Sequence, residues 1–559
     1  MFPSLRGYRK GWLRSDLIAG LTVWAVLVPE ALAYASIAGV SPVVGLYAAP
    51  AALIFYAAFG SSRQLVVGPG SATAALSAAT IGDMVAPGSG VFLALTTTLA
   101  ITTGMIALLA GLLRLGFLAS FISEPVMKGF ILGLALTIII GQVPGLLGME
   151  GGAGEFFDKL WAVLTNLSSA DGLTALIGIG SLAFIFAVKK VSRTAPGSLI
   201  VALLAIVLVA TLNLQDDGVA IVGTIKTGLP DFGVPDVPSG NWGDLMVGGF
   251  AMLLIAFAEG LGAAKTFAAK EHQQVDANKE LIGLGAASLG AGLSGGMSVN
   301  GSLSKSAVNA DSGAKSQLSG LFVAALTILT ILFLTGLFED LPEATLAAIV
   351  IAAVIELVDF PSMARFFKAP GRSDRARLGV AGRPDFIASL AAMLGVLIFD
   401  TLPGLIIGIV VSILLLVYRT SRPNIAVLGK APGEDGQFND LERHPDNRPV
   451  PGISVLRVEG GIFFANADAV TAEIRKRGGQ EGIRAVIIDA ETVPFIDISA
   501  MNALNELAAE FSGEGKSLVM ARNIGAVRDE IERGGSGYGW KVYPGVHEAV
   551  NALTASTLG

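Results

Sequence analysis

The stretch Gly295-Gly-Met-Ser-Val-Asn-Gly-Ser-Leu-Ser-Lys-Ser-Ala-Val-Asn309 is a polar, glycine-rich interruption in an otherwise apolar part of the chain. Strongly apolar segments flank it at 281–294 and 318–338. A bilayer core holds no water for broken backbone, so irregular backbone survives there only where it lines a cavity. Lys305 at that depth would cost about 2.5–3.5 kcal/mol on insertion scales unless a partner, water or an anion lies beside it. The stretch therefore predicts a polar cavity inside a membrane-spanning bundle.

A similar stretch occurs earlier, at Leu65-Val-Val-Gly-Pro-Gly-Ser-Ala-Thr-Ala-Ala-Leu76. Helices that start at 68–72 and 301–305 would direct free backbone N–H groups and positive dipole ends at the membrane midplane. Two interrupted segments in corresponding halves of a membrane protein indicate the substrate site of a transporter. We expect this site to include Gly70 and Ser71 from the first segment, and Gly301, Ser302, Ser304 and Lys305 from the second. A loop without a ligand is the alternative, but the count of spans requires a helix here.

The composition supports a polytopic membrane protein. Of 559 residues, 53% are hydrophobic and 15% are charged, whereas soluble domains carry about 25% charged residues. The chain has no cysteine, which excludes disulfides, thiolate metal sites and thiol nucleophiles. It shows no catalytic constellation, its histidines are isolated, and Gly513-Glu-Gly-Lys-Ser517 lacks the first glycine of a P-loop. We therefore expect no enzyme, no metal, no cofactor and no nucleic-acid partner.

Fourteen apolar stretches predict fourteen transmembrane segments. Basic residues follow the N-terminus and the even-numbered segments, while acidic residues dominate the opposite loops, which places both termini in the cytoplasm. The basic side includes Arg6, Arg63, Arg114, Lys189, Lys265, Lys315 and the run 365–383, and Lys159 and Lys226 are exceptions on the other side. The stretches are 16–36, 43–60, 65–82, 91–113, 118–147, 172–190, 196–213, 244–268, 280–295, 298–312, 316–338, 342–364, 384–401 and 403–419.

The two sets of seven segments carry a weak internal repeat. Asp16-Leu-Ile-Ala-Gly precedes Glu30, and Asp244-Leu-Met-Val-Gly precedes Glu259 at nearly the same spacing. Because seven is odd, the second half would have inverted topology, as in many transporters. We expect residues 1–425 to form this membrane domain.

The composition changes after the last apolar stretch. Residues 426–451 contain four prolines and are expected to form a polar linker. Residues 452–559 then alternate as a soluble α/β domain would, with strands at 453–458, 462–464, 484–490 and 517–522 and helices at 467–477, 498–511 and 545–554.

Two acidic residues lie in predicted spans. Glu30 comes four residues before Tyr34, on one helical face after Pro29, and Glu259 lies in the middle of its segment. Membrane-embedded carboxylates are neutral unless they are paired. The sequence leaves three interpretations open: proton coupling, an ion pair between Glu259 and Lys305, and a purely structural role.

Together these residues resemble the sulfate permease (SulP) family of anion transporters and exchangers over nearly the whole chain. The resemblance rests on Asp16-Leu-Ile-Ala-Gly-Leu-Thr22, Val28-Pro-Glu-Ala-Leu-Ala-Tyr-Ala35, Val67-Gly-Pro69, Asn278-Lys-Glu-Leu-Ile282 and Gly301-Ser-Leu-Ser-Lys-Ser-Ala-Val-Asn309. The carboxyl domain is similar to a STAS domain in Phe463-Phe-Ala-Asn466, Val486-Ile-Ile-Asp489 and Ile496-Asp-Ile-Ser-Ala500.

The resemblance implies a nucleobase-permease-like fold, a seven-plus-seven inverted repeat divided into a core bundle and a gate bundle. It further implies a homodimer in the cell (cytoplasmic) membrane that carries an anion by an elevator motion. Glu30, Tyr34, Gly70, Ser71, Ser304 and Lys305 would face the anion. A small inorganic or carboxylate anion, such as sulfate, bicarbonate or a dicarboxylate, is the expected substrate.

The sequence departs from the family at two of these positions. The family usually has Gln where Glu30 stands and commonly Arg where Lys305 stands. An acid beside an anion site repels the substrate unless it is protonated, so we expect anion–proton symport with Glu30 and Glu259 as ion-coupling residues. Sodium is a less suitable coupling ion, because Ala263 offers no oxygen one turn after Glu259.

Three alternatives remain at this point. The protein could be an anion exchanger, an uncoupled chloride-type channel of the same fold, or, less plausibly, a membrane sensor with the STAS domain as its output. In the STAS domain, Ile498 and Ala500 replace the residues that flank the usual phosphorylated serine, so regulation through Ser499 is doubtful.

Overall fold

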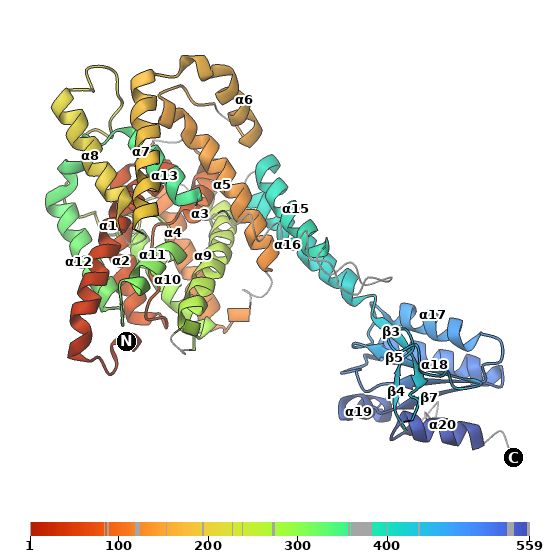
Figure 1. Cartoon of the computed structure of the whole chain (residues 1–559). Coiled ribbons are helices and arrows are strands. Elements are labelled where there is room, and N and C mark those ends of the chain that lie inside the picture. The colour runs from red at the N-terminus through yellow and green to blue at the C-terminus, as the bar shows by residue number, and fades with distance from the viewer. Residues whose placement is uncertain are drawn as a thin grey trace. The chain divides into compact units, whose positions relative to one another are not determined.

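The computed structural model describes residues 2–559 except 83, 87–88, 118–122, 153, 193–194, 226, 238, 271–273, 356–357, 359–382, 400, 434–435, 534–540 and 556–559. The chain forms two compact units, Met1–Ser412 and Ile413–Gly559 (Figure 1). The predicted basic run 365–383 falls almost wholly outside the described residues.

The first unit is a helical bundle. Eight described helices of the chain are long and apolar enough to cross a membrane, and three more apolar helices are shorter. The last of the eight, Thr401–Thr420, continues past Ser412 into the second unit. The helices are α1 (Leu13–Ile37), α2 (Pro42–Phe59), α3 (Ser71–Gly82), α4 (Gly90–Leu112), α5 (Glu124–Leu147), α6 (Phe156–Asn166), α7 (Gly172–Val191), α8 (Gly197–Leu212), α9 (Trp242–Lys270), α10 (Ala277–Leu293), α11 (Leu303–Asp311), α12 (Leu318–Leu329), α13 (Glu343–Ile355), α15 (Arg383–Phe399) and α16 (Thr401–Thr420). A π-helical turn, Thr330–Leu334, extends α12.

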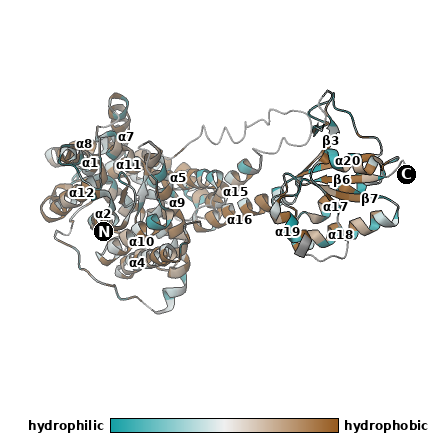
Figure 2. Cartoon of the chain, turned by 90° about the horizontal axis from the view of Figure 1, so that it is seen from below, coloured by the Kyte–Doolittle hydropathy of each residue, from teal (hydrophilic) through white to brown (hydrophobic). Residues whose placement is uncertain are grey.

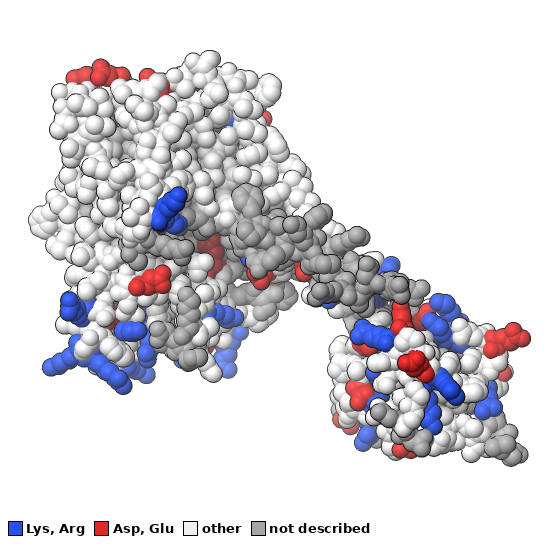
Figure 3. Space-filling view, in the orientation of Figure 1, with Lys and Arg blue, Asp and Glu red and all other residues white. Residues whose placement is uncertain are grey.

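The surface of this unit fits a lipid environment. Large apolar side chains are exposed on several of its helices, among them Leu112, Leu176 and Phe333 at 70%, 70% and 75% exposure. Figure 2 shows mostly apolar colour over these helices. In Figure 3 basic side chains gather at the end of the unit that holds the N-terminus, whereas the opposite end carries acidic ones, with some acidic side chains also lying between the two ends. This segregation is the one that the positive-inside rule requires.

Two short strands pair with each other in antiparallel fashion inside the bundle. Strand β1 (Val66–Gly68) pairs with β2 (Asn300–Ser302), with Val67 opposite Gly301. Helix α3 begins three residues after β1, and α11 begins directly after β2. The two polar interruptions of the sequence therefore meet each other, and each ends in the start of a short helix.

Buried hydrogen bonds fasten β1 to the surrounding helices. The backbone N–H of Val66 donates to Ser306 Oγ at 2.8 Å, and Asn309 Nδ2 donates to the Gln64 carbonyl at 3.0 Å. Gln317 Nε2 donates to the carbonyls of both Ser62 and Leu65. Backbone groups inside a membrane need such partners, and these bonds join β1 and the residues before it to α11 and to Gln317, which precedes α12.

Helices α1–α4 and α9–α12 form the bundle around this pair of strands. Helix α4 packs closely on α10, where glycines permit the contact: a Cβ at Gly104 would lie 2.4 Å from the Leu289 nitrogen, and one at Gly285 would lie 2.8 Å from the Leu108 nitrogen. Small residues at such contacts are typical of helix packing in membranes. A second group packs among itself: α5 contacts α13 and α15, and α7 contacts α8 and α13.

The second unit contains a six-stranded sheet in the order β4-β3-β5-β6-β7-β8. The strands are β3 (Asn424–Lys430), β4 (Phe438–Asp440), β5 (Ile453–Glu459), β6 (Ala485–Asp489), β7 (Ser517–Ala521) and β8 (Val542–Tyr543). Helices α17 (Ala467–Gly478), α18 (Ile498–Gly513), α19 (Gly525–Arg533) and α20 (Val546–Ala555) complete the unit. Strands β5 to β8 are parallel, and β3 pairs antiparallel to both β4 and β5.

This unit differs from the sequence-based expectation in several places. Helix α19 and strand β8 were not expected. The stretch 426–451, expected to be a linker, contains β4 and most of β3. Alternating side chains of β3 enter both faces of the sheet, Ile425 and Val427 on one and Ala426 and Leu428 on the other, which outweighs the prolines nearby. The expected strand 462–464 is only an isolated bridge from Ile462 to Ile496.

Candidate functional site

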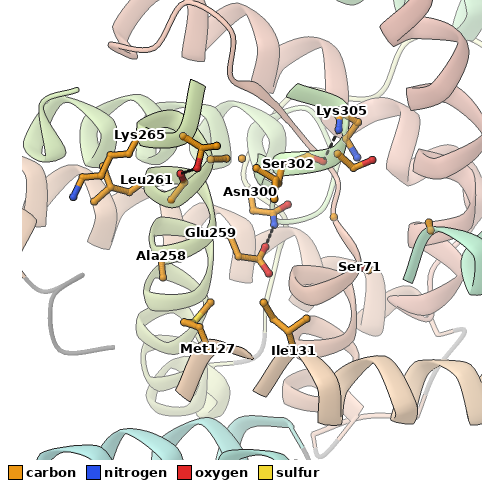
Figure 4. A pocket seen from close by; sticks show the side chains of 18 of the residues that line it. Ser71, Met127, Ile131, Ala258, Glu259, Leu261, Lys265, Asn300, Ser302 and Lys305 are labelled. Carbon is orange, nitrogen blue, oxygen red and sulfur yellow. Dashed lines mark hydrogen bonds between the residues drawn. The ribbon is translucent and has the colours of Figure 1, made fainter. Parts of the chain in front are cut away.

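A cavity of about 560 Å³ lies at the starts of α3 and α11. It brings together all nine residues that the sequence singled out: Glu30, Tyr34, Gly70, Ser71, Glu259, Gly301, Ser302, Ser304 and Lys305. They come from four helices, from β2 and from the turn between β1 and α3, in both halves of the chain. Figure 4 shows several of these side chains directed into one space.

Lys305 is the central cation of this cavity. Its side chain is 2% exposed, and Nζ lies 3.0 Å from Oε2 of Glu30 and 3.1 Å from the carbonyl oxygen of Pro69. The ammonium also lies 5.0 Å from the ring centroid of Tyr34, a cation–π contact. The Tyr34 hydroxyl donates to Glu30 Oε2 at 3.3 Å. Glu30 thus neutralises the charge that membrane burial would otherwise disfavour.

Glu259 has a different partner from the one considered in the sequence. Of the two possible ion pairs, Lys305 makes the one with Glu30, so the expected alternative of a Glu259–Lys305 pair is wrong for this structure. Oε2 of Glu259 instead accepts a hydrogen bond from Nδ2 of Asn300. The reason is positional: Asn300 lies in β2, beside Glu259 on α9, whereas Lys305 lies in the first turn of α11 and reaches toward α1.

The helix starts are set by local sequence. Ser302 is the N-cap of α11, and its Oγ accepts from the backbone N–H of Lys305 at 3.2 Å. Gly301 must be glycine for space, because a Cβ there would lie 2.7 Å from Cα of Gly260. Ser71, 6% exposed, is the first residue of α3. The first N–H groups of a helix lack intrahelical partners, so these two starts give the cavity donors and positive dipole ends suited to an anion.

The opposite wall of the cavity comes from the second group of helices. Met127 and Ile131 of α5 and Ala353 of α13 supply apolar surface there. Figure 4 shows Met127 and Ile131 facing Glu259 across the space. The polar partners of the site therefore belong to one bundle, and Met127, Ile131 and Ala353 of the other bundle contribute apolar surface beside it.

Further charged residues, apart from the Lys305–Glu30 pair and Glu259, line the same cavity. Glu124 and Lys128 of α5 form an ion pair at 2.9 Å, with 72% and 24% of their side chains exposed. Lys265 and Thr266 of α9 also line it. Together with Glu124 they make this part of the cavity wall charged, in contrast to the apolar surface of Met127 and Ile131.

Sequence reasoning missed several lining residues. Asn300 lies inside the stretch that predicted the cavity. Its contact with Glu259 depends on its position in β2, opposite Gly68, which the sequence does not reveal. Glu124 and Lys128 carried a signal, since charges four residues apart stand at the start of an apolar segment. Met127, Ile131 and Ala353 carried none, because they look like any other apolar residue of a span.

Two family models match the chain: the sulfate permease family over residues 13–374, and the STAS domain over residues 444–549. The chain belongs to the sulfate permease family. A probable sulfate transporter of Mycobacterium tuberculosis is 36% identical over 531 residues, which cover 94% of this chain and 92% of that protein. Probable sulfate transporter 4.2 of Arabidopsis thaliana is 31% identical over 575 residues, 98% of this chain and 82% of that protein.

Solved structures of two other proteins share the fold. The overall structure of SLC26A9 matches with a TM-score of 0.89 at 21% identity, over 99% of this chain and 92% of that one. The transmembrane domain of the cyanobacterial bicarbonate transporter BicA matches with a TM-score of 0.61 at 22% identity, over 73% of this chain and 98% of that one. The predicted polytopic helical membrane domain with a carboxyl STAS domain is confirmed. The relatives are named as transporters, in agreement with the absence of a catalytic pattern.

Proposed function

We propose that this sulfate permease family member is a secondary active carrier of small anions, which works by an elevator form of alternating access. The observation that carries the proposal is the ion pair between Lys305 and Glu30, at the point where α3 and α11 begin. One cation, two helix starts and the serine hydroxyls of Ser71, Ser302 and Ser304 suit an anion that enters and displaces Glu30 from Lys305.

The division of the cavity wall favours an elevator. The polar groups of the site belong to helices that the β1–β2 pair and the bonds of Gln317 and Asn309 join into one body. The facing surface of α5 and α13 is apolar beside the site. If the body that holds the polar groups slides along the apolar surface of α5 and α13, it can carry the anion with it. No hydrogen bond between the described residues of the site and that surface then has to break.

The proposed architecture has fourteen segments in two inverted sets of seven. The observation in favour is that each half places two helices, a short strand and a short helix in the same order: α1, α2, β1 and α3, then α9, α10, β2 and α11. In this arrangement α1–α4 and α9–α12 form the core bundle, and α5, α7, α8, α13, α15 and α16 form the gate.

Proton symport is the proposed coupling. A proton on Glu30 cancels its charge, releases Lys305 and so favours the bound anion, whereas loss of the proton restores the internal pair. The unloaded site is then neutral, which lets the empty carrier return across the membrane. An obligate exchanger needs no such internal counter-ion, so the pair favours net symport over exchange.

Sulfate is the first substrate to test. The relatives at 36% and 31% identity are named probable sulfate transporters, and BicA is named a bicarbonate transporter. At the helix starts the cavity offers the ammonium of Lys305, once an anion displaces Glu30 from it, and neutral hydroxyl and N–H donors, which fits small inorganic oxyanions and carboxylates. We further propose a homodimer in the cytoplasmic membrane with both termini in the cytoplasm. The basic side chains at the N-terminal end of the membrane unit in Figure 3 favour the orientation with the N-terminus in the cytoplasm.

Uptake into proteoliposomes with labelled sulfate, bicarbonate, chloride and a dicarboxylate, under separate pH and sodium gradients, tests this function. The proposal requires saturable uptake of at least one anion and accumulation driven by an inward proton gradient. Unitary currents without saturation would replace the carrier by a channel. Anion binding without any flux would favour a sensor.

A further inference from the structure

The carboxamide of Asn300 stands between Glu259 and the start of α3. Asn300 is 3% exposed, and its Nδ2 donates to Oε2 of Glu259 (Figure 4). Its Oδ1 is buried and accepts no hydrogen bond from the part of the chain that the structure describes. In this orientation the amide N–H has a hydrogen-bond partner and the amide oxygen has none. A buried acceptor without a donor costs about 1–3 kcal/mol.

The unpaired oxygen lies against the helix start of the anion site. A Cβ built on Gly70 would lie 2.0 Å from Oδ1 of Asn300, so the oxygen covers the residue that precedes α3. An acceptor at this place carries partial negative charge next to the positive end of the helix dipole. It therefore opposes an anion that approaches the same helix start.

A half-turn of the amide exchanges its donor and its acceptor. With Glu259 ionised, the carboxylate needs the N–H, and the oxygen must face Gly70. With Glu259 protonated, the carboxylic O–H can donate to Oδ1, and Nδ2 then faces Gly70 as a donor to the anion. In the second orientation, with the anion bound, both sides of the amide have partners, and no covalent bond changes apart from the O–H of Glu259.

We propose that Asn300 is a positioning residue that links protonation of Glu259 to anion binding through this half-turn. The proposal rests on the proposed proton-coupled function and adds a second proton site to the one at Glu30. Because proton and anion favour the same amide orientation, each must strengthen the binding of the other by the same factor.

Other charged groups face the same cavity. Glu30 acts directly on Lys305, at 3.0 Å. Glu124, Lys128 and Lys265 line the cavity as well. The contribution of Glu259 is therefore defined as the part of the pH dependence that needs both Glu259 and Asn300.

The test uses the full-length protein in proteoliposomes with sulfate counterflow, which does not require the empty carrier to return. The KM for labelled sulfate is measured from pH 6 to pH 8 in wild type, Asn300→Leu, Glu259→Gln and the double variant. We expect Asn300→Leu to reduce the pH-dependent change in KM by about fivefold or more, the equivalent of one unsatisfied buried group. Glu259→Gln should reduce the pH-dependent change in KM by the same amount. The double variant should show no larger reduction than either single variant, because both residues act in one coupled step.

Asn309→Leu is the matched control, because it removes a buried amide of α11 that bonds the Gln64 carbonyl and does not line the cavity. It should keep the wild-type pH dependence. The proposal is overturned if Asn300→Leu retains the full pH dependence, or if its effect adds to that of Glu259→Gln. Should Asn300→Leu not fold, an unchanged pH dependence in Glu259→Gln overturns it equally. Wild-type transport without any proton dependence contradicts the proposed function instead.

Discussion

The ammonium of Lys305 lies 3.0 Å from the carboxylate of Glu30, although 275 residues separate them in the chain. One residue comes from α11 and the other from α1, so the pair closes the site between the two halves of the sequence. Both side chains are almost fully buried. A buried charge that loses its partner is strongly disfavoured, and the variants below exploit this dependence.

Glu30→Gln should separate exchange from net uptake. The variant resembles the protonated acid, so Lys305 remains free for the anion and sulfate counterflow should persist. Net uptake should fall at least tenfold, because the empty carrier would have to return with an uncompensated lysine, at a cost of about 2.5 kcal/mol or more. Counterflow and net uptake measured on the same vesicles check this. Glu124→Gln, at the exposed acid of the same cavity, should leave both near wild type.

Lys305→Met should destabilise the protein as well as stop transport. Removal of one member of a buried ion pair costs about 3–5 kcal/mol, because the other charge stays buried and unpaired. The double variant Lys305→Met with Glu30→Gln should recover most of the thermal stability in detergent and remain inactive. If the double variant melts as low as the single one, the pair does not hold the site together in the way described.

Gly70→Ala should abolish anion binding. The added Cβ would lie 2.0 Å from Oδ1 of Asn300, and it would push this amide away from Glu259. The control is Gly82→Ala at the other end of α3, where a Cβ meets nothing within 4 Å. We expect the control to transport normally. Sulfate-dependent thermal stabilisation of each variant measures the difference without a flux assay.

Glu280→Gln should reduce stability without changing sulfate affinity. This fully buried carboxylate accepts from the Tyr56 hydroxyl at 2.7 Å, from Ser61 N and Oγ at 2.9 and 2.6 Å, and from Ser62 N at 3.1 Å. An amide replaces one acceptor by a donor, which leaves a buried donor unsatisfied at a cost of about 1–3 kcal/mol.

Lys279→Ala is the control for Glu280→Gln. It removes an exposed ion pair of the adjacent residue, worth about 0–1 kcal/mol. Thermal unfolding and sulfate KM are measured on both variants. A changed KM in Glu280→Gln with unchanged unfolding would place Glu280 in the transport site rather than in the support of β1.

The centre of the site could be predicted from the sequence because polar interruptions are rare in apolar spans. Helix starts expected at 68–72 and 301–305 were found at Ser71 and Leu303. The spacing of four residues between Glu30 and Tyr34 predicted that they share one face of a helix. The hydrogen bond between their side chains agrees with this.

The partners of these residues could not be predicted, because they depend on packing between distant segments. Nothing in the sequence distinguishes Glu30 from Glu259 as the partner of Lys305, or assigns Asn300 to Glu259. The apolar wall of Met127 and Ile131 has no pattern of its own. In the carboxyl domain the prolines near β3 and β4 led to the prediction of a linker. The two strands form because β3 pairs with β5 and β4 pairs with β3, and the sequence does not reveal these pairings.

Proton movement during sulfate entry tests the central claim most directly. Full-length protein is reconstituted into vesicles that contain a pH-sensitive dye, and sulfate is added outside without an imposed pH gradient. The account predicts that the lumen acidifies as sulfate enters, and that Glu30→Gln vesicles show no acidification while they still exchange sulfate. Sulfate entry without acidification in wild type, or acidification that is undiminished in Glu30→Gln, would contradict it.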